Sequence, residues 1–319
     1  MNKILYVVIP CYNEEEVLKE TSKRLNVKLG ELIKDKIISK DSKVLFVNDG
    51  SKDKTWDIIC ELNKENKLFS GINLSRNRGH QNALVAGLMT AKEYADVVIS
   101  MDADLQDPPS LIPQMLEYWE QGYQDVYAKR ANRGKESWLR KQFSLLFYKI
   151  LDHATRFDIL QNVGDFRLLD KRCINALKKL RETERYTKGM FCWIGYEKKE
   201  IIFDRGDRAA GESNWNFWSL FNLAIEGITS FTTAPLRFAS VTGFIIAFVT
   251  FVYALYFITK TLIVGDPVQG FTTLIVVILF LGGIQLLTIG ILGEYIGRIF
   301  NETKNRPAYL ASEYNEQLL

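Results

Sequence analysis

The chain has 319 residues, of which 25% are charged and 47% hydrophobic, and its formal net charge is +3. This length suits one large domain or two smaller ones, and a net charge this small gives no reason to expect a nucleic-acid partner. The cysteines form neither a C-x-x-C pair nor a metal-binding spacing, so we expect reduced thiols in a cytosolic compartment. These cysteines are Cys11, Cys60, Cys173 and Cys192.

The first 130 residues alternate short apolar runs with helical patterns. Strands are predicted at 4–9, 43–48, 71–74, 97–101 and 125–128, and helices at 13–34, 52–66, 80–92 and 109–121. This alternation predicts an α/β fold with a mostly parallel sheet that has helices on both faces. Polar loops follow the first four strands, with the sequences PCYNEE, DGSKDKT, SRNRGHQN and DADLQDPP. Ligands of such sheets bind beyond the carboxyl ends of the strands, so we expect the four loops to form one site.

The fourth loop places three carboxylates within six residues, directly after an apolar strand. Asp102 and Asp104, with the amide of Gln106, form an oxygen-rich set that suits Mg²⁺ or Mn²⁺. An EF-hand is excluded, because Pro113 stands where its last glutamate would be. Asp107 precedes Pro108 and is predicted to cap the next helix.

A divalent cation with few protein ligands commonly takes a substrate diphosphate to complete its shell. Neither G-x-x-x-x-G-K-[ST] nor a G-x-G-x-x-G after a strand is present, which argues against a P-loop NTPase and a dinucleotide oxidoreductase. The remaining interpretation is a nucleotide held by side chains and a metal. Asp49 is a candidate acceptor for a base N–H, and a simple Asp-Gly turn is the alternative.

Beyond residue 130 the sequence becomes basic and then amphipathic. Lys129, Arg130, Arg133 and Lys135 open a predicted amphipathic helix at 128–151, and a second, aromatic-rich one covers 216–231. Such helices lie in the headgroup layer of a membrane, although packing on the sheet is an alternative. Two longer segments follow, of 21 residues at 238–258 and 22 residues at 271–292, and neither carries a charge.

These two segments are each long enough to span a membrane, and two long buried helices of a soluble protein are the alternative. Arg237 precedes the first, while Arg298, Lys304 and Arg306 follow the second. The positive-inside tendency therefore predicts a multi-pass protein of the cytoplasmic membrane with both termini and the N-terminal region in the cytoplasm. The first residues do not resemble a signal peptide.

Seven segments, in order along the chain, resemble the motifs of the family 2 inverting glycosyltransferases, and in particular the polyprenyl-phosphate glycosyltransferases. They are VVIPCYNEE, VNDGSKDKT, SRNRGHQNAL, MDADLQDPP, GDFRLLDKR, RAAGESNW and LGEYIGRIF. The resemblance runs from Val7 to about Arg306. It implies a GT-A fold, a nucleotide-sugar donor with UDP as the expected nucleotide, and a lipid phosphate acceptor.

The resemblance also implies residue roles. Residues expected to bind the donor are Pro10, Tyr12, Glu14, Asp49, Arg76 and Asp102, with Asp49 at the base and His80 nearby. Asp102, Asp104 and Gln106 would hold Mg²⁺ or Mn²⁺ against the diphosphate, and Asp104 would thereby take part in catalysis. Asp165 lies where inverting relatives have a proposed general base, and a structural ion pair with Arg167 or Arg172 is the alternative.

A lipid phosphate is already largely ionised near neutral pH, since its second pKa is about 6, so a base contributes less than it would for a sugar hydroxyl. We therefore expect Asp165 to position the acceptor, or an arginine that binds it, as much as to take a proton. Asn214 stands where many relatives have lysine, so phosphate binding would pass to arginines and lysines elsewhere. These are Arg130, Arg133, Lys135, Arg205 and Arg208, with Arg133 also expected to act in catalysis.

The sequence thus predicts transfer of a hexose, inverting and metal-dependent, from a nucleotide sugar to polyprenyl phosphate at the cytoplasmic membrane face. A saccharide acceptor is one alternative, but the Q-x-x-R-W motif and additional spans of processive synthases are absent. A non-catalytic nucleotide-sugar-binding membrane protein is the other, and a homo-oligomer is possible in either case. The expected division is a catalytic domain at 1–212, an interfacial helix at 213–235, two spans at 236–294 and a cytosolic tail at 295–319.

Overall fold

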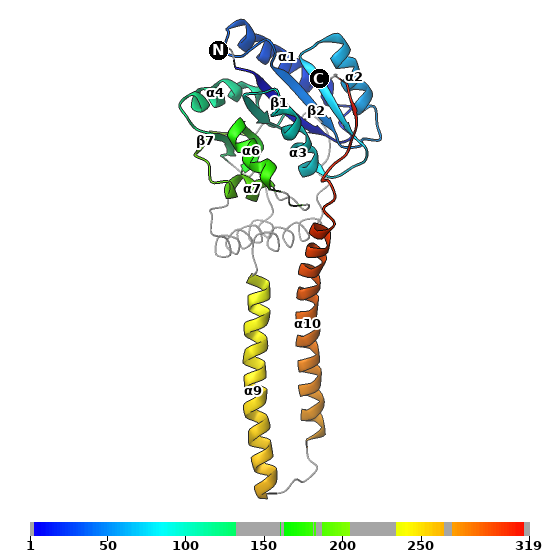
Figure 1. The fold of residues 1–319 in the computed structure, drawn as a ribbon, viewed down its shortest axis with the longest axis vertical. Coiled ribbons are helices and arrows are strands. Elements are labelled where there is room, and N and C mark those ends of the chain that lie inside the picture. The colour runs from blue at the N-terminus through cyan, green and yellow to red at the C-terminus, as the bar shows by residue number, and fades with distance from the viewer. Residues whose placement is uncertain are drawn as a thin grey trace.

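A computed structural model describes residues 3–131, 160, 163–180, 182, 187–204, 234–264 and 270–315. The elements of its N-terminal part are β1 (Leu5–Cys11), α1 (Leu18–Lys34), β2 (Lys43–Asn48), α2 (Thr55–Glu65), β3 (Phe69–Leu74), α3 (His80–Ala91), β4 (Val97–Ser100), η1 (Pro109–Leu111), α4 (Ile112–Glu120) and β5 (Asp125–Arg130). They are followed by β6 (Val163–Asp170), α6 (Lys171–Lys179), α7 (Thr187–Trp193), β7 (Lys198–Phe203), α9 (Ala234–Val264), α10 (Phe271–Thr303) and β8 (Ala311–Tyr314). Figure 1 shows an α/β domain from which α9 and α10 extend.

One eight-stranded sheet organises the domain, in the order β7-β5-β6-β4-β1-β2-β3-β8. Strands β4, β1, β2 and β3 are mutually parallel, as the alternation of strands and helices predicts. The sheet as a whole is mixed, however, because β6 pairs antiparallel with β4 and β5, and β8 pairs antiparallel with β3. β6 enters between two strands predicted from the sequence, and β8 comes from the far end of the chain.

Two apolar layers cover the sheet, because successive side chains of a strand point to opposite faces. Val7 and Ile9 of β1 belong to the layer that α1, α2 and α4 cover, whereas Tyr6 and Val8 pack with α3, α6 and α7. Gly87 brings α3 close to the sheet, since a Cβ there would lie 2.3 Å from Val8 Cγ1. The helices thus lie on both faces, as expected, and α3 is held tightly above the centre of the sheet.

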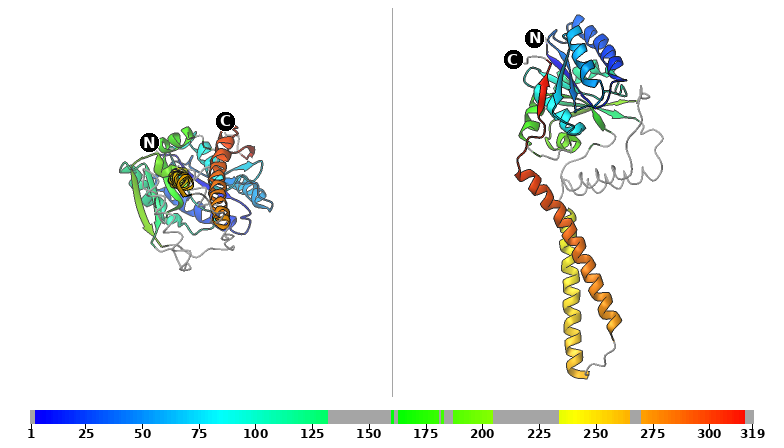
Figure 2. Two further views of the ribbon diagram at one scale, coloured as in Figure 1. Left: turned by 90° about the horizontal axis from the view of Figure 1, so that it is seen from below. Right: turned by 90° about the vertical axis from the view of Figure 1, so that its right-hand side faces the viewer.

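Helices α9 and α10 extend away from the domain together in Figure 1 and in the right-hand view of Figure 2. They contain the two apolar segments predicted from the sequence, and their large apolar side chains are exposed, such as Phe244 at 74% and Leu286 at 72%. Within the described residues, one helical stretch, Phe280–Thr303, is long and apolar enough to cross a membrane, judged by length and composition. The predicted amphipathic helices at 128–151 and 216–231 lie almost wholly outside the described residues.

The chain beyond α10 returns to the domain. Residues 304–310 lead to β8, which lies against β3 at the edge of the sheet, and the chain end lies near α2 in Figure 1. Trp56 Nε1 of α2 donates a hydrogen bond to Glu313 Oε2 at 2.9 Å. The segment predicted as a separate cytosolic tail therefore supplies a strand of the N-terminal sheet.

Candidate functional site

The loops after β1, β2, β3 and β4 meet at one edge of the sheet, because these four strands are parallel. Asn13 joins the first loop to the second: its backbone N–H donates to Ser51 Oγ at 2.9 Å, and its Oδ1 accepts from Lys52 N–H at 2.9 Å. Asn13 has a φ of 55°, in the left-handed region that asparagine tolerates. These contacts hold residues 12–17 as a loop, so α1 begins at Leu18 and later than the prediction.

Asp49 joins the second loop to the third. Its side chain is buried at the end of β2, where Oδ1 accepts from Arg78 N–H at 2.7 Å and Oδ2 accepts from Gly79 N–H at 2.9 Å. Burial raises the pKa of Asp49, and the two backbone hydrogen bonds offset only part of that effect. Asp49 therefore fixes the start of α3, and its contact with a nucleotide base stays a prediction.

The fourth loop folds back on itself after Asp102. Asp104 Oδ1 accepts from Gln106 N–H at 3.1 Å, and Leu105 between them has a φ of 60°. Asp102 keeps 31% of its side chain exposed, whereas Gln106 is buried. This short polar turn ends the strand and brings the carboxylates of the loop close together.

The prediction that Asp107 caps a helix is wrong. Asp107 is buried, and its Oδ2 accepts a hydrogen bond from Asp102 N–H at 3.3 Å. The following helix has Pro108 at its cap position and no side-chain cap. Pro108 and Pro109 have no backbone N–H to offer the carboxylate, so Asp107 turns inward and supports Asp102 instead. Burial and the charge of Asp102 raise the pKa of Asp107 to about 7.

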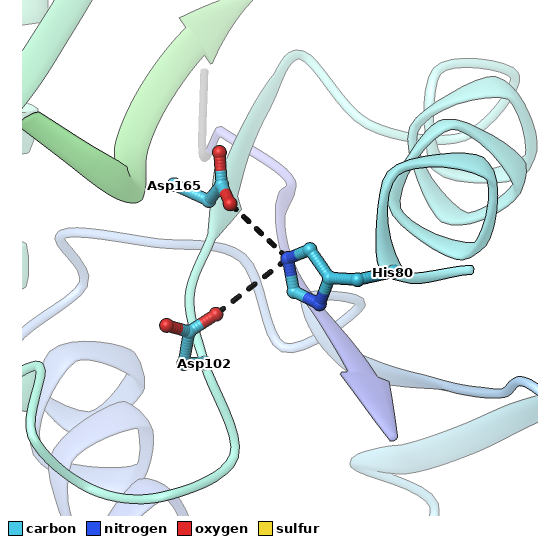
Figure 3. A group of neighbouring side chains, drawn as sticks. All are labelled: His80, Asp102 and Asp165. Carbon is cyan, nitrogen blue, oxygen red and sulfur yellow. Dashed lines mark hydrogen bonds and ion pairs between the residues drawn. The ribbon is translucent and has the colours of Figure 1, made fainter. Parts of the chain in front are cut away.

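Three side chains from different elements converge above this loop, as Figure 3 shows. His80 is the first residue of α3, Asp102 follows β4, and Asp165 belongs to β6. His80 Nε2 lies 3.1 Å from Asp165 Oδ2 and 3.7 Å from Asp102 Oδ1. The His80 side chain is 44% exposed and the Asp165 side chain 16%, so the group opens to solvent on the histidine side.

The charges of this cluster depend on one another. Burial lowers the pKa of His80, but the hydrogen bond with Asp165 and the charges of Asp165 and Asp102 outweigh it and raise this pKa to about 9. For Asp165, burial raises the pKa, yet the His80 hydrogen bond and the charge of Lys188 hold it well below its usual range. Near neutral pH the pair is therefore a histidinium beside a carboxylate.

The structural alternative for Asp165, an ion pair with Arg167 or Arg172, is not what the structure forms. Arg167 pairs with Asp125 at 3.2 Å, and both side chains are buried. Arg172 pairs with Asp170 at 2.9 Å, next to the start of α6. His80, a weak candidate on sequence alone, is the ion-pair partner of Asp165, and only the fold brings these residues together across 85 positions.

Two cations lie around the cluster. Arg130, at the end of β5, lies against Gly164, where a Cβ would be 3.3 Å from Arg130 Nη2. Burial raises the pKa of Asp102 and of Asp107, and the charge of Arg130 offsets part of that effect. Lys188 of α7, which the sequence analysis missed, acts on Asp165 in the same way. Among the described residues, Arg130 Nε is buried and has no hydrogen-bond partner. The other predicted acceptor residues lie outside the described residues, namely Arg133, Lys135, Arg205 and Arg208, as does Asn214.

The spacing of the cluster would suit a divalent cation once His80 has lost its proton, because a metal-binding histidine must be neutral. The nearest ligand atoms of His80, Asp102 and Asp165 all lie within 4.8 Å of one another, and this is the one such group of three found in the part of the chain that the structure describes. Asp165 Oδ1 is buried with no hydrogen-bond partner there. Imidazole is a ligand for transition metals such as Zn²⁺ and Fe²⁺, whereas carboxylates suit Mg²⁺ and Mn²⁺. This set shares only Asp102 with the predicted set of Asp102, Asp104 and Gln106.

The remaining predicted donor residues are spread along the same edge. Pro10 is buried within β1, whereas Tyr12 is 43% exposed and Arg76 is also exposed. Glu14 lines a cavity of about 390 Å³ between the first and second loops. That cavity is lined by residues of the first two loops and not by the His80 cluster. A donor contact for each of these four residues stays a prediction.

With this arrangement described, comparison with known proteins decides the family. Residues 6–177, more than half of the chain, match the family described as glycosyl transferase family 2. The chain belongs to this family. The resemblance drawn from the seven motifs is thereby confirmed, and the chain is a glycosyltransferase with a GT-A-like α/β fold. Residues 234–299, which contain most of α9 and α10, match the family described as the GtrB C-terminal hairpin.

Relatives of this glycosyltransferase match over nearly its whole length. An uncharacterized glycosyltransferase of Synechocystis is 43% identical over 97% of this chain and 95% of its own. The SfII prophage-derived bactoprenol glucosyl transferase of Shigella flexneri is 41% identical over 95% of this chain and 96% of its own. Among solved structures, glucosyl-3-phosphoglycerate synthase from Mycobacterium tuberculosis, in complex with Mn²⁺, uridine diphosphate and product, is 15% identical with a TM-score of 0.43, and covers 71% of this chain and 78% of that one.

Proposed function

We propose that this glycosyltransferase moves a hexose from a UDP-sugar to a polyprenyl phosphate at the cytoplasmic face of the membrane, with inversion at the anomeric carbon. The position of Arg130 carries the proposal, because this cation lies beside the His80–Asp102–Asp165 cluster and its buried Nε has no hydrogen-bond partner among the residues that the structure describes. Such a guanidinium suits a phosphate oxygen. The bactoprenol glucosyl transferases, related over almost the full chain, support a lipid acceptor.

In the proposed reaction, a phosphate oxygen of the lipid attacks the anomeric carbon and forms the new C–O bond. The bond from that carbon to the donor diphosphate breaks, and the nucleoside diphosphate leaves with the electron pair. The acceptor phosphate is already largely ionised, since its second pKa is about 6. Asp165 is a weak proton acceptor because its pKa is depressed, which favours a role in holding His80 and orienting the acceptor.

For the metal we propose the predicted ligands Asp102, Asp104 and Gln106. Three oxygen donors from one loop suit Mg²⁺ or Mn²⁺, whereas His80 and Asp165 already form a pair with each other at 3.1 Å. When bound, the cation neutralises charge on the departing diphosphate. The positive charges of Arg130 and Lys188 would offset the negative charges of the carboxylates near the cation. The reacting groups would then lie between the metal-binding loop and these two cationic side chains.

We also propose that α9 and α10 form a membrane hairpin with the catalytic domain and both termini in the cytoplasm. At 31 and 33 residues, each helix is longer than the roughly 20 residues that cross a bilayer. Their exposed apolar side chains support insertion, and the basic residues that flank the hairpin support this orientation. The acceptor phosphate would then lie at the membrane surface that faces the catalytic domain.

The test is transfer by membranes that contain the protein, supplied with undecaprenyl phosphate and one labelled donor at a time. UDP-glucose, UDP-N-acetylglucosamine, UDP-galactose and GDP-mannose form the panel. We expect one UDP-sugar to give an organic-soluble labelled lipid, Arg24→Ala, at an exposed position of α1, to behave as wild type, and Asp104→Asn to give none. Absence of labelled lipid with every donor would overturn the proposal.

A further inference from the structure

The segment after α10 is fastened to the third loop of the catalytic edge through Arg78. Arg78 Nε donates to the backbone carbonyl of Ala308 at 2.8 Å, and its Nη2 donates to that of Pro307 at 3.2 Å. A planar guanidinium can serve two neighbouring carbonyls at once because its donors are set in a fixed fork. Only the residues from Lys304 to Arg306 separate these carbonyls from the end of α10.

The segment is also fixed to the start of this loop and to strand β3 before it. Ser75 N–H donates to the Leu310 carbonyl at 2.9 Å. Beyond it, β8 pairs with β3, and Asn315 Oδ1 accepts a hydrogen bond from Gly71 N–H at 2.6 Å. Strand β3 leads directly into the loop at 75–79, so the returning segment holds both the strand and the loop that follows it.

Arg78 is also attached to the catalytic edge by its backbone. Its N–H donates to Asp49, and its carbonyl accepts from Asn82 Nδ2 at 2.8 Å, within the first turn of α3. Gly50 packs against the same loop so closely that a Cβ there would lie 2.5 Å from Asn77 N. His80, which pairs with Asp165, follows Arg78 by two residues. A change in the position of Arg78 is therefore transmitted over a very short path to the cluster.

We propose that Arg78 is a positioning residue that couples the segment 304–315, and through it helix α10, to His80 and Asp165. The buried Asp49 fixes one side of the third loop, and the carbonyls of Pro307 and Ala308 fix the other through the guanidinium. The C-terminal segment is then part of the catalytic unit and sets the geometry of the cluster without touching substrate. The kinetic part of this inference rests on the function proposed above.

The test uses the full-length protein in lipid nanodiscs and two measurements, hydrogen exchange of residues 71–79 and 307–315, and steady-state kinetics. We expect Arg78→Ala to speed exchange in both segments and to lower kcat about tenfold, the order expected for loss of a charge-assisted hydrogen bond. The donor KM should stay within about twofold of wild type, because the loss falls on the geometry of the reacting groups. Arg78→Lys should remain below wild type, since an ammonium lacks the fork.

Two further proteins complete the design. A chain ending at Arg306 should reproduce the kcat loss and the fast exchange at 71–79, whereas Arg24→Ala, an exposed arginine in an ion pair on α1, should change neither measurement. Unchanged exchange at 71–79 in Arg78→Ala, or faster exchange with normal kcat, would overturn the coupling. If the wild type transfers no sugar, the proposed function fails, and the exchange measurement still decides whether Arg78 joins the two segments.

Discussion

His80 and Asp165 illustrate how individual side chains acquire unusual chemistry here. Each is an ordinary ionisable group in the sequence, and their contact shifts both pKa values away from the usual range in opposite directions. The raised pKa of His80 contributes stability that is fully present below about pH 6.5 and is lost as the pH rises through about 9. The depressed pKa of Asp165 contributes stability that is present above its ordinary value of 3.8 and is lost as the pH falls below it. His80 and Asp165 therefore remain an ion pair at neutral pH.

We expect the imidazole of His80 to titrate near pH 9 in the metal-free protein, as followed by NMR of histidine-labelled samples in EDTA. Asp165→Asn should move that midpoint down toward 6.5, because the hydrogen bond and the negative charge are both lost. The chain has two histidines, so His80→Gln identifies the signal. A His80 midpoint near 6.5 in the wild type would contradict the ion pair.

Mn²⁺ binding, measured by electron paramagnetic resonance, separates the two possible ligand sets. We expect Asp102→Asn and Asp104→Asn to weaken binding at least about tenfold, since each removes a charged ligand, and His80→Gln to leave it nearly unchanged. The opposite pattern, with His80→Gln weakening binding and Asp104→Asn not, would move the cation to the His80–Asp102–Asp165 set.

At the scale of elements, α3 combines tight packing with a functional first residue. Gly87 lets the helix lie on β1 and β2, since a Cβ would be 2.3 Å from Val8 Cγ1 and 2.8 Å from Val47 Cγ2. His80 begins the same helix, after Gly79 with a φ of 86°. The position of the histidine therefore depends on how closely this helix rests on the sheet.

We expect Gly87→Ala to lower the free energy of unfolding by about 1–3 kcal/mol, the usual cost of overpacking a core. Gly30→Ala in α1 is the matched control, because nothing lies within 4 Å of its Cβ. It should raise helix stability by up to about 1 kcal/mol. Thermal unfolding of both variants in the same detergent provides the measurement, and equal midpoints would contradict the packing of α3.

Local pattern predicts the elements up to β5 well, because each strand is an apolar run followed by a polar loop. It misses β6, β7 and β8. β6 carries Asp165 at a half-buried position and Arg167 at a buried one, so it lacks the apolar run by which strands are recognised in the sequence. The prediction for Asp107 fails for a similar reason: an aspartate before proline fits a helix cap by sequence, and only the folded loop shows that it accepts from Asp102 N–H instead. Long-range contacts decide such cases.

At the scale of the whole molecule, helices α9 and α10 are connected to the sheet through β8, which follows α10. Two long helices leave the domain and the chain returns to it as β8, so a residue near the C-terminus lies beside Trp56. The sequence shows the two apolar segments and the charges beside them, and these predict the two long helices. It contains no local signal that residues 311–314 pair with the edge of the sheet. That contact joins segments more than 200 positions apart.

Cysteine labelling in intact spheroplasts tests the orientation of the hairpin. We expect Gln269→Cys, between α9 and α10, to react with an impermeant maleimide, and Lys23→Cys on α1 to react only after lysis. The four native thiols give a low background, because burial raises the pKa of each. Labelling of Lys23→Cys before lysis, with Gln269→Cys unreactive, would reverse the orientation.

The most direct test of the proposed function compares two acceptors in the purified protein. Labelled UDP-sugar is supplied with undecaprenyl phosphate or with undecaprenol, which differs only in lacking the phosphate. We predict organic-soluble labelled lipid with the phosphate and none with the alcohol, and loss of product in Asp165→Asn. Equal transfer to the alcohol, or label found only in a water-soluble saccharide, would contradict a lipid phosphate as the acceptor.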